Sequence, residues 1–223
     1  MRSKFDEELL QLNDMLVEMG TMIGKSIERA TNAIINHDKK TAKKAIAADR
    51  DIDNIEKEIE TLCLRLLLRQ QPVARDLRLI SSALKMITDM ERIGDQAADI
   101  SEIAKSLIVG KKNTMNLDNI PLMADATSKM VVDSINAFVK RDLVLAKKVI
   151  NDDDVVDDLF KKIRSDVVEL IQKDQANSEQ AIDYIMIAKY FERIGDHATN
   201  IAEWVVFAIT GKHVSSRKLI DED

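Results

Sequence analysis

The sequence contains one pentapeptide twice, Glu-Arg-Ile-Gly-Asp at residues 91–95 and again at 192–196, an offset of 101 residues. The segment before it also recurs, at an offset of 104, so that Asp49 matches Asp153. Constant offsets of this length indicate an internal duplication. The chain therefore consists of one folding unit and its copy, and the three-residue difference predicts a shorter loop before the last helix.

Apolar residues in each unit recur at steps of three or four, the spacing of one helix face. In the first unit such stripes cover residues 5–36, 46–70 and 80–107. Only 6 Gly and 2 Pro occur, too few to divide an all-β chain into short strands. The sequence predicts an all-α fold of two tandem three-helix bundles, formed by residues 1–112 and 113–223 and related by internal duplication.

The composition of the chain bears on whether it binds nucleic acid, spans a membrane or is exported. The net charge of −6 and the 4% aromatic content argue against nucleic-acid binding. The longest aliphatic stretch near the C-terminus, Trp204–Ile209, is too short to span a bilayer. A single cysteine, Cys63, and a start without signal-peptide character predict a cytoplasmic protein.

Paired acidic residues, four positions apart, lie at equivalent places in the two units. The pairs are Asp49 with Asp53, Glu91 with Asp95, Asp153 with Asp157, and Glu192 with Asp196. Two carboxylates at this spacing lie about 6 Å apart on one helix face and repel each other, by a few tenths of a kcal/mol. Oxygen ligands without imidazole or thiolate suit Mg²⁺, Mn²⁺ or ferric iron better than structural zinc. A metal site and a merely solvated acidic face both remain open at this point.

Two enzymatic motifs fail on their spacing. A ferritin-like di-iron site needs Glu three residues before His, and none of His37, His197 and His213 has one. The segment from Gly20 to Gly24 resembles a phosphate-binding loop but has one residue too few and lies in a helical stripe. Close helix packing explains these glycines better.

Four other residues have less specific patterns. Cys63 is expected to be a buried apolar residue, and His197 a surface histidine that could otherwise join a metal site. Arg75 and Arg78 are expected to be exposed, either for contact with a partner or in surface ion pairs.

Several longer segments resemble the PhoU family of phosphate-uptake regulators over essentially the whole chain. They are MRSKFDEELLQLNDMLVEMG, QPVARDLRLI, the duplicated ERIGD, and FERIGDHATNIAEWVVFAITG. The resemblance implies two three-helix bundles related by pseudo-twofold symmetry. It also implies metal clusters, expected to contain iron, with manganese, magnesium and zinc as alternatives.

The ligands that the resemblance implies are the four acidic pairs above, each a Glu/Asp-x-x-x-Asp motif. Asp99 continues the acidic row in the first unit, whereas Asn200 takes the equivalent place in the second and has only one carbonyl oxygen to offer. The two sites are therefore expected to differ in occupancy or nuclearity.

The resemblance also implies a regulatory protein without catalytic turnover. It would act beside the phosphate ABC transporter and a sensor histidine kinase to repress the phosphate-starvation response, and would reach the membrane only through these protein partners. A homodimer is an open alternative to a monomer. The competing hypotheses are a metal-independent helical interaction module and, more weakly, a carboxylate-bridged metalloenzyme.

Overall fold

The computed structural model describes residues 2–70, 72–108, 118–173 and 178–214. These residues form six α-helices and no strand, which confirms the all-α prediction. The helices are α1 (Arg2–Asn36), α2 (Lys39–Gln70), α3 (Ala74–Leu107), α4 (Asn119–Lys140), α5 (Leu143–Lys173) and α6 (Ser178–Thr210).

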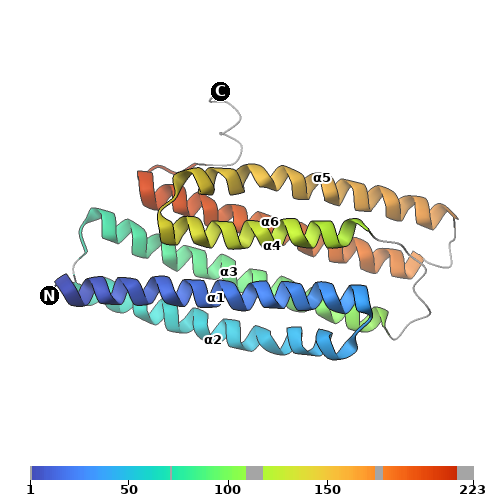
Figure 1. Cartoon of the computed structure of the whole chain (residues 1–223), viewed down its shortest axis with the longest axis horizontal. Coiled ribbons are helices and arrows are strands. Elements are labelled where there is room, and N and C mark those ends of the chain that lie inside the picture. Colours follow the sequence, from blue (N-terminus) through green and yellow to red (C-terminus); the bar gives the residue numbers. More distant parts are fainter. Residues whose placement is uncertain (1, 71, 109–117, 174–177, 215–223) are drawn as a thin grey trace, which may run out of the picture.

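The six helices form two three-helix bundles that lie side by side (Figure 1). α3 packs against α6 and α1 against α4, so these four helices join the two halves, while α2 and α5 lie at the outer edges (Figure 1). The predicted boundary between residues 112 and 113 falls in the segment 109–117, outside the described residues.

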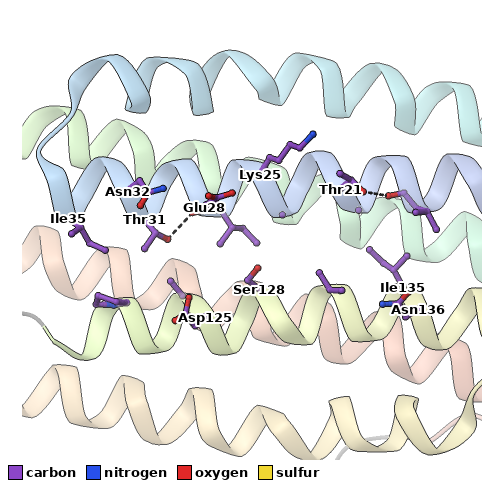
Figure 2. Close-up of a pocket in the computed structure, with 17 residues that line it drawn as sticks. Thr21, Lys25, Glu28, Thr31, Asn32, Ile35, Asp125, Ser128, Ile135 and Asn136 are labelled. Atoms are coloured by element: carbon purple, nitrogen blue, oxygen red, sulfur yellow. Dashed lines mark hydrogen bonds between the residues drawn. The ribbon is translucent and has the colours of Figure 1, made fainter.

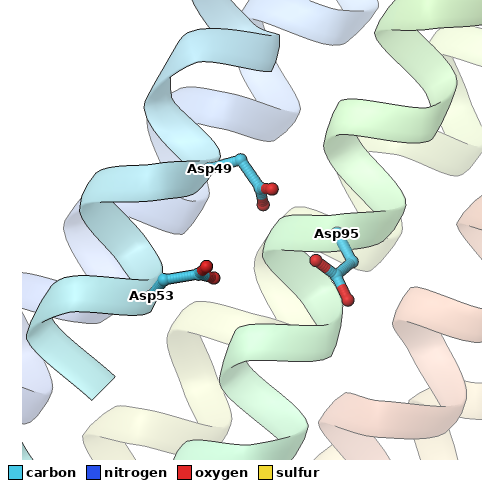
Figure 3. A group of neighbouring side chains, drawn as sticks. All are labelled: Asp49, Asp53 and Asp95. Atoms are coloured by element: carbon cyan, nitrogen blue, oxygen red, sulfur yellow. The ribbon is translucent and has the colours of Figure 1, made fainter. Parts of the chain in front are cut away.

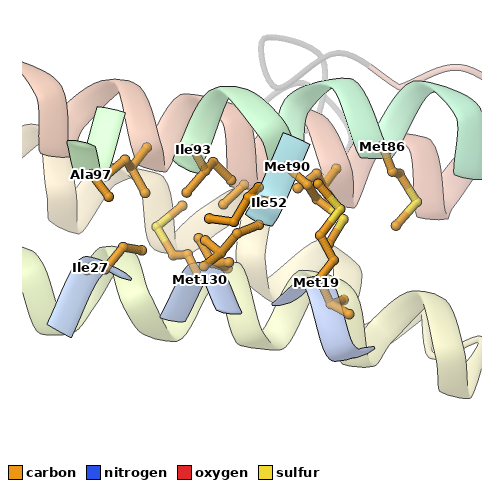
Figure 4. Packing of buried hydrophobic residues seen from close by; sticks show 14 of the residues in the cluster. Met19, Ile27, Ile52, Met86, Met90, Ile93, Ala97 and Met130 are labelled. Carbon is orange, nitrogen blue, oxygen red and sulfur yellow. The ribbon is translucent and has the colours of Figure 1, made fainter. Parts of the chain in front are cut away.

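One continuous core runs through both bundles and consists mainly of aliphatic side chains and methionines. Figure 4 shows Met19 and Ile27 from α1 facing Met90 and Ile93 from α3, with Met130 from α4 nearby. Burying such a side chain contributes roughly 1.5–3 kcal/mol. Because aromatic residues are few, flexible methionines fill the irregular spaces where the bundles meet.

The first turns of the two halves have the same geometry. His37 and Arg141, 104 residues apart, are the non-glycine residues with positive φ among those described, at 51° and 54°. In both turns the following aspartate donates its N–H to a helical carbonyl, from Asp38 to Ala33 and from Asp142 to Ala137. This arrangement ends one helix and starts the next, and the left-handed residue is normally glycine or asparagine.

The halves differ near the start of their third helices. α3 begins 17 residues before Glu91, whereas α6 begins 14 residues before Glu192. The predicted shorter loop before α6 falls on residues 174–177, which lie outside the described residues.

A groove of about 630 Å³ separates α1 from α4 on one side of the junction (Figure 2). Gly20 belongs to its wall, where a Cβ atom would lie only 2.4 Å from Cδ1 of Ile135 on α4. Close helix packing is confirmed for Gly20. It is wrong for Gly24, because a Cβ atom there would meet nothing within 4 Å.

Candidate metal centre

The first acidic cluster lies where α2 and α3 pack against each other. Asp49 and Asp53 project from successive turns of α2 toward Asp95 on α3 (Figure 3). One carboxylate oxygen from each residue lies within 4.8 Å of the others, and all three side chains are half-buried. The structure thus gathers three of the predicted ligands into one oxygen-rich group.

Gly94 allows this close approach of the two helices. A Cβ atom at this position would lie 3.1 Å from two atoms of Ile52 and 3.5 Å from Oδ1 of Asp49. Any larger residue would push α3 away from α2 or fill the space beside the Asp49 carboxylate. The glycine of the repeated pentapeptide therefore has a role in packing that also positions its aspartate.

Crowding among these carboxylates disfavours their charged forms. The pKa of Asp49 is raised to about 6, first by burial and then by the charges of Asp95, Asp53 and Asp99. The pKa of Asp95 is raised as well, by burial and by Asp53. A bound cation would remove this repulsion, since opposite charge favours the ionised carboxylate.

The Oδ1 atom of Asp49 is a direct sign that the group suits a cation. It is buried and has no hydrogen-bond partner among the described residues. A buried polar atom left without a partner costs free energy and calls for an explanation such as a bound ion. The donor set of carboxylate oxygens fits a hard cation at this point.

Glu91 and Asp99 lie at the two margins of this cluster. The pKa of Glu91 is raised by burial, then by Asp95 and Asp53. The Asp99 charge acts on Asp49, but its side chain also hydrogen-bonds Tyr190 on α6. The α3 row therefore extends beyond the central three aspartates in both directions.

Glu56 is an acidic neighbour that the duplication could not reveal. It is half-buried, its pKa is raised by burial and by Glu60, and its charge also acts on Glu91. Phe160 occupies the equivalent position 104 residues later. The signal available in the sequence was the continuation of the Asp49 and Asp53 row by one further turn.

The second cluster has the same plan but less close contacts. Asp153 and Asp157 on α5 face Asp196 on α6, and the pKa of Asp153 is raised to about 6 by burial and by both of these charges. Gly195 would place a Cβ atom 3.4 Å from Oδ1 of Asp153, much as Gly94 would beside Asp49. Among the described residues, only the first cluster brings three ligand atoms within 4.8 Å.

A lysine changes the charge of the second cluster. Lys189 forms an ion pair with Glu192, and its charge opposes the rise in the pKa of Asp196 that burial and Glu192 cause. The first cluster has Thr88 at the equivalent position, 101 residues earlier. The second cluster is therefore less negative, a difference that adds to the predicted contrast between Asp99 and Asn200.

Asn200 lies at the interface between the halves, and its amide donates to Oδ1 of Asp89 on α3 at 3.2 Å. His197 Nδ1 lies 2.8 Å from the same oxygen. The prediction of a surface position for His197 is wrong, because the side chain is buried between α3 and α6. Cys63, in contrast, is buried as predicted.

A family model for the PhoU domain matches the chain twice, over residues 16–104 and 120–205. The chain belongs to the PhoU family. Both matched ranges contain one complete acidic cluster, and the family assignment confirms the resemblance seen in the sequence.

PhoU relatives align over nearly the whole chain. The phosphate-specific transport system accessory protein PhoU homolog of Clostridium acetobutylicum is 38% identical over 96% of this chain and 97% of its own length. PhoU homolog 1 of Thermotoga maritima is 35% identical over 94% and 90%.

Solved PhoU structures have the same fold. PhoU from Pseudomonas aeruginosa superposes with a TM-score of 0.89 at 33% identity, covering 93% of this chain and all of the solved one. The phosphate transport system regulatory protein PhoU from Streptococcus pneumoniae gives 0.87 at 27% identity, over 95% and 99%. In the described part of this PhoU family member, no helix is long and apolar enough to cross a membrane.

Proposed function

We propose that this protein is an accessory regulator of phosphate transport whose two acidic clusters bind metal ions. The observation that carries the metal assignment is the convergence of Asp49, Asp53 and Asp95, with a buried Asp49 oxygen that has no partner in the described chain. The assignment to phosphate transport is supported by the names of the relatives, which are accessory proteins of that system.

The ligands proposed for the first metal site are Asp49, Asp53, Glu91, Asp95 and Asp99, and for the second Asp153, Asp157, Glu192, Asp196 and Asn200. Carboxylates can bridge neighbouring cations, so each row of oxygens could hold more than one ion. Ferric iron is the proposed occupant because it is a hard, highly charged cation, with manganese, magnesium and zinc as alternatives. The ion would mainly relieve the repulsion among the clustered carboxylates of each bundle.

The proposed partners are the phosphate ABC transporter and a sensor histidine kinase, on the cytoplasmic side of the membrane. The transporter follows from the relatives' names, and the kinase from the resemblance to the family. The role proposed is regulatory, with no substrate turnover. Deletion of the gene is expected to change phosphate-responsive transcription and transport, and unchanged values of both would contradict this role.

The metal sites can be tested with two matched double variants. Glu91→Gln with Asp95→Asn removes two charges from the first cluster with little change in shape, and Glu192→Gln with Asp196→Asn does the same in the second. Elemental analysis of protein purified without chelator should show metal lost from one cluster and kept in the other. Equal metal content in the wild type and in both variants would show that the ions lie elsewhere.

A metal-independent interaction module is the second candidate. The continuous apolar core favours it, because every helix contributes buried aliphatic residues and the fold does not depend on an ion for its cohesion. Under this hypothesis, chelation leaves partner binding unchanged. Binding to the transporter before and after metal removal therefore separates the two candidates.

A further inference from the structure

A small cavity at one end of the molecule is lined by three arginines. The start of α3, the turn between α4 and α5, and the end of α6 meet at this end (Figure 1). The cavity has a volume of about 200 Å³ and receives Arg75 and Arg78 from α3 and Arg141 from the turn. Apolar side chains from α4 and α6, among them Phe138 and Val205, form the rest of its wall.

The arginines have no acidic partner in the described part of the chain. None of the three guanidinium groups forms an ion pair or a hydrogen bond there. The Nε atom of Arg78 is buried without any partner, although the sequence predicted an exposed side chain. Its guanidinium lies against Gly211, where a Cβ atom would be 3.6 Å from Nε.

The negative end of the α6 helix dipole offsets only a small part of the positive charge of the three arginines. The C-terminus of α6 carries the equivalent of about half a negative charge, whereas three arginines supply three full positive charges. A buried charged donor without a partner is costly, and unpaired groups of this kind commonly mark a bound ion. The cavity therefore has an excess of positive charge and of N–H donors.

The fold does not require arginines at these positions. By the internal repeat, Arg141 corresponds to His37 and Arg78 to Glu179, so the matching end of the other bundle combines a histidine with an acid. Arg141 also has a left-handed backbone, which is unfavourable for a residue with a Cβ atom. The turn imposes that backbone in both halves, but only the second half places a guanidinium there.

We propose that this arginine pocket binds a phosphoryl dianion, with free inorganic phosphate as its ligand. One guanidinium fork satisfies both oxygens of a carboxylate, whereas three forks from two segments match the four oxygens and double charge of phosphate. A volume of about 200 Å³ holds such an ion with a few waters and is smaller than the cavities that bind drug-sized molecules.

This pocket lies between the two halves, since α3 belongs to the first and the other lining segments to the second. A bound ion would therefore link the bundles, independently of the metal clusters. A phosphate-binding pocket would deepen the proposed function, because the regulator itself would then bind the ion whose transport it regulates. It depends on that function only for its biological meaning.

Calorimetric titration of the full chain with inorganic phosphate at pH 8 tests the proposal. Arg78→Gln and Arg141→Gln should each weaken binding by about tenfold or more, while Arg29→Gln, a half-buried arginine of α1 outside the cavity, should leave it unchanged. Metal content is measured on the same samples, so that phosphate bound at the clusters is recognised. Equal phosphate affinity in all variants would overturn the pocket.

Chemical protection of the wild-type protein tests the pocket without any variant, so that misfolding of a variant cannot affect the result. Phosphate should slow the reaction of phenylglyoxal with Arg75, Arg78 and Arg141 but not with Arg29, as mapped by mass spectrometry. Acetate at the same ionic strength should not protect, and equal protection by acetate would overturn the phosphoryl assignment. Stronger protection by phosphoserine than by phosphate would support the pocket chemistry and place the phosphoryl group on a larger molecule. If phosphate neither binds nor protects these arginines while the metal sites remain occupied, the arginine pocket is overturned but the proposed function is not.

Discussion

His197 on α6 and Asp89 on α3 form a pair across the junction of the two bundles, with 2.8 Å between Nδ1 and Oδ1. Asp89 corresponds by the repeat to Tyr190, which hydrogen-bonds Asp99. Each half thus uses the same position to hold a polar side chain of the other half. These paired polar contacts fix how α3 and α6 are aligned within an otherwise apolar interface.

Replacing His197 with alanine should destabilise the protein by roughly 1–3 kcal/mol, because the half-buried Asp89 carboxylate loses its closer partner. Asn200→Ala should cost less than about 1 kcal/mol, since that side chain is exposed and its bond is longer. Urea unfolding of both variants measures the difference. A larger loss in Asn200→Ala than in His197→Ala would contradict this assignment.

Two glycines on α1 offer a matched test of the packing between the bundles. Gly24→Ala should stabilise the protein by about 0.5–1 kcal/mol, because alanine favours the helix and meets no neighbour. Gly20→Ala gains the same preference but forces Ile135 out of its position, at a cost of roughly 1–3 kcal/mol. Thermal unfolding should therefore rank Gly24→Ala above the wild type and Gly20→Ala below Gly24→Ala. The reverse order would show that α1 and α4 pack differently.

The metal-free protein should lose stability as the pH rises through the range set by its raised aspartate pKa values. Between the ordinary value of 3.8 and about 6, the folded state keeps protons on Asp49 and Asp153 that the unfolded state has released. The stabilising contribution is complete below that range and lost above it.

The double variant Asp49→Asn with Asp153→Asn isolates this effect. It should match the metal-free wild type near pH 4 and be more stable at pH 7, because the amides do not ionise. Melting temperatures across this range, with chelator present, give the comparison. A constant difference at all pH values would rule out titration of these two groups as its cause.

Gly94→Ala should weaken metal binding at the first cluster without changing any charge. The added methyl group would contact Ile52 and reduce the space beside the Asp49 carboxylate. Gly195→Ala serves as the counterpart, with its effect confined to the second cluster. Metal titration of each variant measures the loss, and unchanged binding in both would show that these glycines serve packing alone.

Periodicity in the sequence predicted all six helices, because each amphipathic stripe is a property of a single helix. The duplication likewise predicted that Asp49, Asp53 and Asp95 would be equivalent to residues of the second half. The structure adds that one carboxylate oxygen from each of these three aspartates lies within 4.8 Å of the others. The sequence therefore identified the residues of the cluster, and the structure supplied the distances between them.

Contacts between the halves could not be predicted in this way. The burial of His197 depends on Asp89, which lies 108 residues earlier, and no helical pattern links the two. The same limit applies to Arg78, whose surroundings come from α4 and α6. Gly20 and Gly24 look alike in the sequence, and only the position of Ile135 distinguishes them.

The packing of α3 against α6 has a consequence for synthesis on the ribosome. When α3 has been made, the helix that covers its second apolar face is still about a hundred residues from completion. The nascent first bundle therefore exposes that face until translation reaches the end of α6, and it must be kept from pairing with the equivalent face of another nascent chain. Contacts so distant in sequence also close slowly, so the joining of the two bundles is expected to be the late step in folding.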